Sequence, residues 1–197
     1  CAIETLLFDH AYRAVNRSKL RDDPSAMLKQ ISQLHTDNDV MILSGGVSMG
    51  KYDYVPAILG ELEVELIFHK ILQRPGLPMW FGISADDKPV FGLPGNPVST
   101  MVCLLRYVIP ALNYASGQTA KTPEFVPLAA NVDFEADLSW FLPVRLKNSR
   151  SGREAQPQPT NTSGDFIGLR GTDGVVELPR GKNHFPAGYR ARLFRWS

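Results

Sequence analysis

The sequence predicts an α/β domain followed by a small all-β domain. Between residues 21 and 117, apolar runs of strand length alternate with segments of helical periodicity, which is typical of a doubly wound, three-layer α/β fold. A stretch containing Thr and Pro follows at residues 117–127. Beyond it, short apolar segments separated by Gly, Pro, Ser and Asn indicate a β-barrel or sandwich. We therefore place the two domains at residues 1–118 and 119–197.

Composition narrows the class of protein. The chain has 197 residues, 44% of them hydrophobic, and a formal net charge of +1, so a core can form and the charge gives no indication of a nucleic-acid partner. Cys1 and Cys103 are too few for a disulfide framework or a zinc site, and the four histidines lack metal-ligand spacing. No apolar run reaches the roughly 18 residues of a transmembrane helix, and no signal-peptide pattern is recognisable. We expect a cytoplasmic enzyme or binding protein without a membrane partner.

The first part of the chain begins with a segment that is hard to interpret. Residues 1–20 contain a short apolar run at 6–8, from which we expect part of a helix or strand packed on the sheet. Asp23 followed by Pro24 is a good helix start, with Asp as N-cap and Pro in the first turn. A helix with one apolar face then follows to about residue 38.

The next segment is the centre of the prediction. Residues 39–43 read as a buried strand, which ends at the sequence SGGVSMG of residues 44–50 and is followed by Asp53. Glycines let the backbone bend sharply and let a ligand approach the main chain. The carboxyl end of a strand is where ligands sit in open α/β sheets, and exposed turn N–H groups favour anions. An ordinary tight strand-to-helix turn would give the same pattern.

Further elements follow in the same alternation. We expect a helix at 55–62 and a strand at 64–68 that ends at Lys70, where a lysine can reach solvent or a ligand; a lysine lying along a strand edge is the alternative. Residues 73–78 form a rigid Pro-Gly loop, and 79–83 with 90–93 form a hairpin.

A second strand-to-helix turn lies at residues 93–97, the sequence LPGNP. Asn96 can cap the helix that follows, and Pro97 suits its first turn. Pro110 is expected to kink or break this helix. In the second domain, residues 125–132, 141–146, 175–178 and 189–194 are expected strands, and the polar stretch 149–163 is an expected mobile loop.

Three stretches together resemble one family, the molybdopterin molybdenumtransferases of the MoeA type, which include the E domain of gephyrin. They are residues 44–50 with Asp53, Lys70 with residues 74–78 (RPGLP), and residues 93–99 (LPGNPVS). The resemblance covers about residues 20–197. It implies a molybdopterin-binding α/β domain, a C-terminal β-barrel-like domain, and insertion of molybdate into adenylylated molybdopterin with release of AMP, supported by Mg²⁺.

The resemblance also implies roles for particular residues. Catalysis would fall to Asp53, Lys70 and Arg74, with Asp53 as the metal ligand. The pterin nucleotide would be bound by Ser44, Gly45, Gly46, Val47, Ser48, Gly50, Pro94, Gly95, Asn96, Pro97 and Ser99. Molybdate would be bound by Lys70, Arg74, Pro75 and Ser163. The chemistry suits these types, because phosphates need main-chain donors, Mg²⁺ needs a carboxylate and an oxyanion needs fixed cations.

The sequence also departs from the family pattern. Arg74 stands where lysine is usual, Leu77 replaces a frequent lysine, and Pro143 occupies a place where arginine is frequent, with Arg145 as its substitute. The strand and helix that usually open the α/β domain have no clear match in residues 1–20. The family has two more N-terminal domains and forms a homodimer, and a molybdopterin adenylyltransferase is an expected partner.

Three alternatives stay open from the sequence. One is the related enzyme that makes the pterin adenylate, although the LPGNP turn and the β domain argue against it. Another is a non-enzymatic molybdopterin-binding or gephyrin-like scaffold module. In the third, the glycine turns are purely structural.

Overall fold

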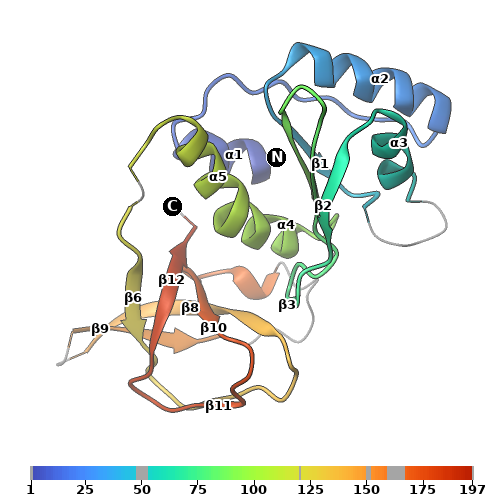
Figure 1. Cartoon of the computed structure of the whole chain (residues 1–197). Helices are drawn as coiled ribbons and strands as arrows, with labels where there is room; N and C mark the ends of the chain where they lie inside the picture. The colour runs from blue at the N-terminus through green and yellow to red at the C-terminus, as the bar shows by residue number, and fades with distance from the viewer. Residues whose placement is uncertain (1, 48–52, 120, 150–151, 159–166, 197) are drawn as a thin grey trace.

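The computed structural model describes residues 2–47, 53–119, 121–149, 152–158 and 167–196. Its first sheet has four strands in the order β1 (Met41–Ser44), β5 (Pro89–Leu93), β4 (Trp80–Ile83) and β2 (Glu65–His69). β1 and β5 run parallel, whereas β5, β4 and β2 are antiparallel neighbours. The expected hairpin is therefore present as β4–β5, and the sheet is mixed (Figure 1).

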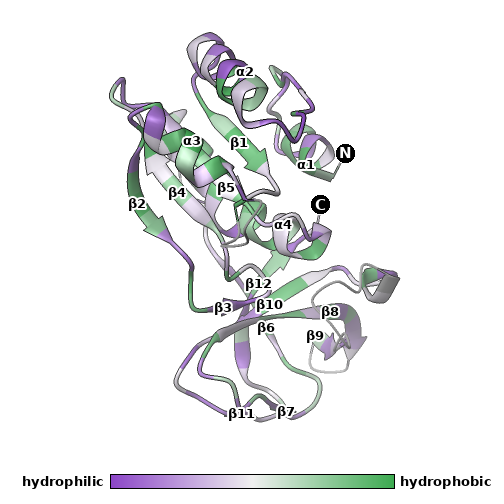
Figure 2. Ribbon diagram, turned by 90° about the vertical axis from the view of Figure 1, so that its right-hand side faces the viewer, coloured by the Kyte–Doolittle hydropathy of each residue, from purple (hydrophilic) through white to green (hydrophobic). Residues whose placement is uncertain are grey.

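Helices cover both faces of this sheet, as the sequence predicts. On one face α2 (Pro24–Asp37) and α3 (Val55–Glu61) enclose a core that includes Met41, Leu43 and Val90. On the other face α1 (Ala2–Asp9) and a helical stretch comprising α4 (Pro97–Cys103), η1 (Leu104–Val108) and α5 (Ile109–Ala115) pack against Phe91 and Leu93. The three layers are visible in Figure 2.

The helix starts follow the local sequence signals. Asp23 caps α2, because its Oδ1 accepts a hydrogen bond of 2.7 Å from the Ala26 N–H, and Pro24 is the first helical residue. The beginning of the chain is a helix, α1, that buries Leu6 and Leu7. It therefore packs on the sheet as expected.

The helical stretch Pro97–Ala115 bears on two expectations. Of the expected kink or break at Pro110, the break is absent: the helix continues through Pro110 after the π-helical turn η1, where the Ile109 N–H bonds the Leu104 carbonyl five residues back. The stretch has 19 residues and is apolar enough, by length and composition, to cross a membrane, so the sequence-based exclusion of such a run was too strict. Half of its most apolar window is buried inside the protein, and we interpret it as a core helix.

The second sheet contains β3 (Gln73–Arg74), β8 (Ser139–Ser149), β10 (Gly174–Leu178), β12 (Arg190–Arg195) and β6 (Glu124–Pro127) in this order, with β9 (Gly152–Pro157) paired to β8. A bridge between Leu128 and Ala155 joins β9 to the chain just after β6 and gives the sheet a barrel-like closure. β7 (Val132–Asp133) and β11 (His184–Phe185) form a separate pair, and η2 (Ile167–Leu169) is a short 3₁₀ turn.

Two features of this sheet differ from the sequence prediction. β9 lies within the polar stretch that was expected to be a mobile loop; its residues pair with β8 from Val144 to Ser149, so backbone pairing outweighs the polar side chains. β3 belongs by sequence to the first domain but pairs in parallel with Ser139 and Trp140 of β8. This pairing attaches the Pro-Gly loop at residues 74–78 to the second sheet.

A small apolar cluster joins the two parts of the chain. Val102 of α4 packs with Phe141 of β8 and Val175 of β10, all within 1% of complete burial. Beside this cluster, Arg106 Nε lies 3.3 Å from Glu177 Oε1.

Candidate functional site

The two glycine turns predicted from the sequence lie against each other. Ser44 at the end of β1 pairs with Leu93 at the end of β5, and the Gly45 N–H donates to the Leu93 carbonyl at 3.0 Å. Gly45 and Gly46 have φ values of +87° and +69°, a region that favours glycine. A Cβ added at Gly95 would lie 3.4 Å from Gly45 Cα. Glycine at residues 45 and 46 therefore permits the bend of the first turn, and the two turns lie within van der Waals contact of each other.

The first turn crosses the carboxyl end of the sheet and is held at its far side. A Cβ added at Gly92 of β5 would lie 2.7 Å from Val47 Cγ1, so Val47 occupies the space that Gly92 leaves. The Val47 carbonyl lies 2.8 Å from His69 Nε2 at the end of β2. Sequence reasoning did not assign His69 a role, because this contact spans the width of the sheet and has no local signal.

The second turn is shaped by its helix cap. Asn96 Oδ1 accepts hydrogen bonds from the N–H groups of Val98 at 3.0 Å and Ser99 at 3.2 Å. Asn96 is therefore the helix cap that the sequence predicts. The Thr100 hydroxyl donates to the Pro94 carbonyl and fixes the turn from inside.

The Pro-Gly loop forms a third wall. Gln73 is 1% exposed, and its Nε2 donates to the Pro75 carbonyl at 2.8 Å. Gly76 has a φ of +104°, and a Cβ there would lie 2.5 Å from Gln73 Nε2 and 2.7 Å from Cys103 Sγ. Gln73 and Cys103 thus fill the space directly beneath the loop.

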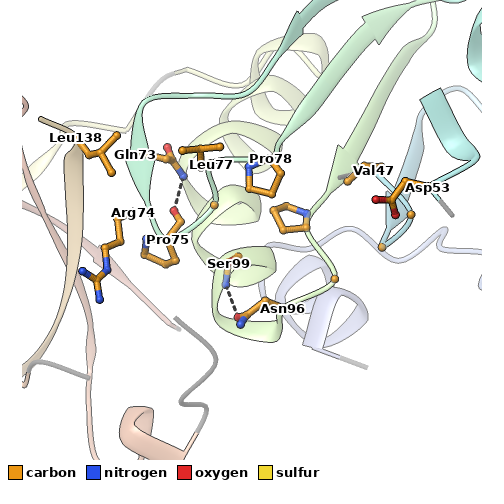
Figure 3. A pocket seen from close by; sticks show the side chains of 15 residues that line it. Val47, Asp53, Gln73, Arg74, Pro75, Leu77, Pro78, Asn96, Ser99 and Leu138 are labelled. Carbon is orange, nitrogen blue, oxygen red and sulfur yellow. Dashed lines mark hydrogen bonds between the residues drawn. The ribbon is translucent and has the colours of Figure 1, made fainter. Parts of the chain in front are cut away.

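These three segments enclose a cavity of about 730 Å³ (Figure 3). Ten residues predicted from the sequence line it: Gly45, Gly46, Val47, Asp53, Arg74, Pro75, Pro94, Gly95, Asn96 and Ser99. Five lining residues were not assigned a role: Gln73, Gly76, Leu77, Pro78 and Leu138. Three of the five, Gly76, Leu77 and Pro78, belong to the Pro-Gly loop at residues 74–78, which the sequence does single out, and Gln73 directly precedes it. Leu138 comes from the second part of the chain and has no sequence signal.

Other predicted residues lie elsewhere or are not described. Ser44, Lys70 and Pro97 do not line the cavity. Lys70 is exposed, has a φ of +76°, and its N–H donates to the Met79 carbonyl at the base of the Pro-Gly loop. Ser48, Gly50 and Ser163 lie outside the described residues. Pro143 is buried and Arg145 is exposed, and neither lines the cavity, so the structure gives no support for Arg145 as a substitute.

Charges are separated along the cavity. Figure 3 places Asp53, beside the glycine turn, at one end and Arg74, beside the second sheet, at the other. Among the described residues, no three His, Cys, Asp or Glu side chains gather as a metal cluster. A single carboxylate suits Mg²⁺, which usually keeps waters and binds one or two carboxylates together with substrate phosphates.

Two side chains behind the Pro-Gly loop stay uncharged. Burial raises the pKa of the Cys103 thiol and of the Tyr107 hydroxyl to about 12 each. Both groups therefore keep their protons at neutral pH and can serve as hydrogen-bond donors.

Comparison with known proteins gives two family matches along the chain. Residues 2–114 match the family described as "Probable molybdopterin binding domain", and residues 126–192 match the "MoeA C-terminal region (domain IV)". A molybdopterin molybdenumtransferase from Synechocystis is 36% identical over 196 residues, 98% of this chain and 48% of the relative. One from Staphylococcus epidermidis is 30% identical over 169 residues, 85% of this chain and 40% of the relative.

Solved structures of related proteins are also similar to this chain. A molybdopterin biosynthesis MoeA protein from Pyrococcus horikoshii is 30% identical, with a TM-score of 0.72 over 90% of this chain and 42% of that one. A molybdenum cofactor biosynthesis protein from Pyrococcus furiosus, at 17% identity, shares the fold with a TM-score of 0.73 over 97% of this chain and 62% of that one. The chain thus spans about half the length of the curated relatives it matches.

Proposed function

Since this chain belongs to the MoeA family of molybdopterin-binding proteins, we propose that it takes part in molybdenum cofactor biosynthesis. The proposed reaction is the insertion of molybdate into adenylylated molybdopterin with release of AMP. The observation that carries the proposal is the cavity itself, where two glycine turns and the Pro-Gly loop meet. In this proposal the protein acts as a molybdopterin molybdenumtransferase, with the pterin nucleotide and molybdate as substrates.

The phosphate groups of the nucleotide would be bound by the glycine turns. Gly45, Gly46 and Gly95 bring main-chain atoms to the cavity without side chains in the way. Backbone N–H groups in such turns bind anions, and because the Gly45 N–H already donates to the Leu93 carbonyl, the donors would come from the other residues of the two turns. The Asn96 cap leaves its own oxygen engaged with the helix, so its contribution is to hold the shape of the second turn.

Mg²⁺ is the metal we propose for the Asp53 end of the cavity. Asp53 lines the cavity beside Gly45 and Gly46, so its carboxylate and the substrate phosphates would be neighbours. When bound, Mg²⁺ would neutralise charge at the phosphoanhydride and make AMP a better leaving group. Asp53 would hold the positive charge of the metal ion at a fixed place, while the glycine turns orient the phosphates.

Molybdate is a tetrahedral dianion and we propose that it binds at the Arg74 end. Arg74 is the cationic side chain among the residues that line the cavity, and its planar guanidinium can donate two parallel hydrogen bonds to an oxyanion. Pro75 and Gly76 would set the position of this end. Ser163 stays a predicted molybdate contact. Lys70, which is not among the lining residues, is expected to contribute less to molybdate binding than Arg74.

The direct test is to incubate the protein with adenylylated molybdopterin, Mg²⁺ and molybdate and to measure AMP release. We expect release that depends on both Mg²⁺ and molybdate. Asp53→Asn should abolish Mg²⁺-dependent AMP release. Asp87→Asn should leave it unchanged, because Asp87 is an exposed carboxylate in the β4–β5 hairpin with a φ of +61° that Asn tolerates.

The outcomes of this test separate the candidate functions. Nucleotide binding without AMP release would favour a non-enzymatic molybdopterin-binding module. Binding to Asp53→Asn with unchanged Mg²⁺-dependent release would contradict the proposed metal ligand. Absence of nucleotide binding would contradict the proposed function altogether.

We further propose a cytoplasmic location, a homodimer in the full-length protein, and a molybdopterin adenylyltransferase as the partner that supplies the nucleotide. The proposed reaction needs an adenylylated substrate, which supports a donor enzyme of this class. Size-exclusion chromatography with light scattering tests the dimer, and transfer of nucleotide from the donor enzyme without release into solution tests the partner.

A further inference from the structure

One continuous helical stretch contacts two walls of the cavity. Its first turn follows Asn96 and contains Ser99, both of which line the cavity. Four residues later Cys103 lies beneath Gly76, and in the η1 turn Tyr107 reaches Gln73. The same helix therefore carries the second glycine turn and touches the support of the Pro-Gly loop.

Gln73 is the link between this helix and the loop. Its Oε1 accepts a hydrogen bond of 2.5 Å from the Tyr107 hydroxyl, and its Nε2 donates 2.8 Å to the Pro75 carbonyl and 3.6 Å to Cys103 Sγ. An unpaired amide at 1% exposure would be costly, so these partners leave the carboxamide one favoured orientation. The raised pKa of Tyr107 keeps its hydroxyl a donor throughout the neutral range.

We propose that Gln73 is a positioning residue: held by Tyr107, its carboxamide fixes Pro75 and Gly76 relative to Asn96 and Ser99 and so sets the shape of the cavity for the phosphorylated pterin. This inference rests on the proposed function for its ligand. It needs no contact between Gln73 or Tyr107 and the reacting atoms. The cavity is shaped by a hydrogen-bonded chain from helix to loop, and Tyr107 acts only through Gln73.

The test uses Tyr107→Phe, which removes one oxygen, Gln73→Met, which keeps the length and removes the amide, and the double variant. Affinity for adenylylated molybdopterin is measured by calorimetry, and hydrogen exchange is measured for peptides covering residues 74–79 in the ligand-free protein. Tyr107→Phe should weaken binding about tenfold, the effect of one buried hydrogen bond, and Gln73→Met, which also removes the bond to the Pro75 carbonyl, should weaken it at least as much. Exchange should accelerate over 74–79 but not in α2 or β10.

The double variant decides whether the two residues act as one unit. If Tyr107 works through Gln73, the double variant should bind within about twofold of Gln73→Met rather than about a hundredfold weaker than the unmodified protein. Tyr114→Phe is the matched control, since Tyr114 lies in α5 of the same helical stretch and is 87% exposed.

Several results would overturn the inference. Binding and loop exchange of Tyr107→Phe within twofold of the unmodified protein would do so, as would fully multiplicative losses in the double variant. Acceleration of exchange throughout the chain would indicate general destabilisation instead of positioning. If the unmodified protein binds no nucleotide, the proposed function fails, and the exchange measurement alone decides whether Gln73 and Tyr107 order the loop.

Discussion

Single side chains decide the charge of the cavity, and Arg74 is the informative case. The sequence assigns positive charge to both Lys70 and Arg74, but of these two only Arg74 lines the cavity. The reason is local geometry: Lys70 lies at the base of the Pro-Gly loop with a positive φ, whereas β3 pairing places Arg74 beside the second sheet. The two residues should therefore differ in their effect on molybdate.

We expect Arg74→Ala to raise the molybdate concentration for half-maximal AMP release ten- to a hundredfold, the approximate effect of losing charge-assisted hydrogen bonds. Lys70→Ala should change it by less than about threefold. Titrations of molybdate at saturating nucleotide make the comparison, with Arg74→Lys as a control that keeps the charge but not the planar fork. An equal loss in both alanine variants would place Lys70 in the molybdate site as well.

At the residue scale, the Glu124–Arg195 ion pair should make the free energy of unfolding depend on pH. Arg195 donates from Nε and Nη2 to the two Glu124 oxygens at 2.7 and 2.6 Å, and these hydrogen bonds lower the pKa of Glu124. The stabilisation is therefore complete above the unfolded pKa of about 4.3 and is lost as the pH falls through the lower folded pKa.

Arg195→Gln should lower the free energy of unfolding at pH 7 by about 0.5–1 kcal/mol, a small value because both side chains are about one-third or more exposed. The difference from the unmodified protein should shrink as the pH is lowered through the folded pKa of Glu124. Urea denaturation at a series of pH values measures it, and a difference that is constant with pH would exclude ionisation of Glu124 as the cause.

At the scale of elements, glycines act in opposite ways according to their surroundings. Gly92 in β5 faces Val47 and Trp80, so a Cβ there would meet Val47 Cγ1 at 2.7 Å and Trp80 Cβ at 3.0 Å. Gly60 lies in α3 with nothing within 4 Å of an added Cβ. The first glycine is required by packing between a strand and a turn, whereas the second lowers the stability of its helix.

We predict that Gly92→Ala destabilises the fold by about 1–3 kcal/mol through overpacking, and that Gly60→Ala stabilises it by about 0.5–1 kcal/mol. Thermal unfolding of the two variants gives the signs directly. Because Val47 belongs to the first glycine turn, Gly92→Ala should also weaken nucleotide binding. Equal melting temperatures for the two variants would contradict this account of the turn.

At the scale of the whole molecule, the sequence predicts the features that arise from contacts between residues close together in the chain, and it misses those that arise from contacts between distant residues. The second glycine turn, the described part of the first (residues 44–47), the Asn96 cap and the β4–β5 hairpin come from short-range signals, and all are present. Gln73, Leu138 and His69 reach their partners only after β3 pairs with β8 or the turn crosses the sheet, so no spacing in the sequence indicates them. Lys70 is the opposite case. The alternation of side chains along a strand indicates the face on which a residue lies, but it does not indicate the bend of the chain that follows the strand.

Long-range contacts also connect the two parts of the chain, and their strength can be measured. Phe141, Val102 and Val175 form a buried cluster between the helical stretch and the second sheet, beside the Arg106–Glu177 pair. Phe141 is 1% exposed, so Phe141→Ala should cost about 3–5 kcal/mol. Because this loss falls on the contact between the two parts, calorimetry should resolve two unfolding transitions in place of one.

Phe125→Ala provides the matched control, since Phe125 lies on β6 of the same sheet and is 48% exposed. It should leave the number of transitions and the melting temperature nearly unchanged. A single transition in Phe141→Ala, shifted downward as a whole, would mean that β3 and the Pro-Gly loop couple the two parts strongly enough without the cluster. In that case the cavity, which is lined from both parts, would be held together by the loop itself.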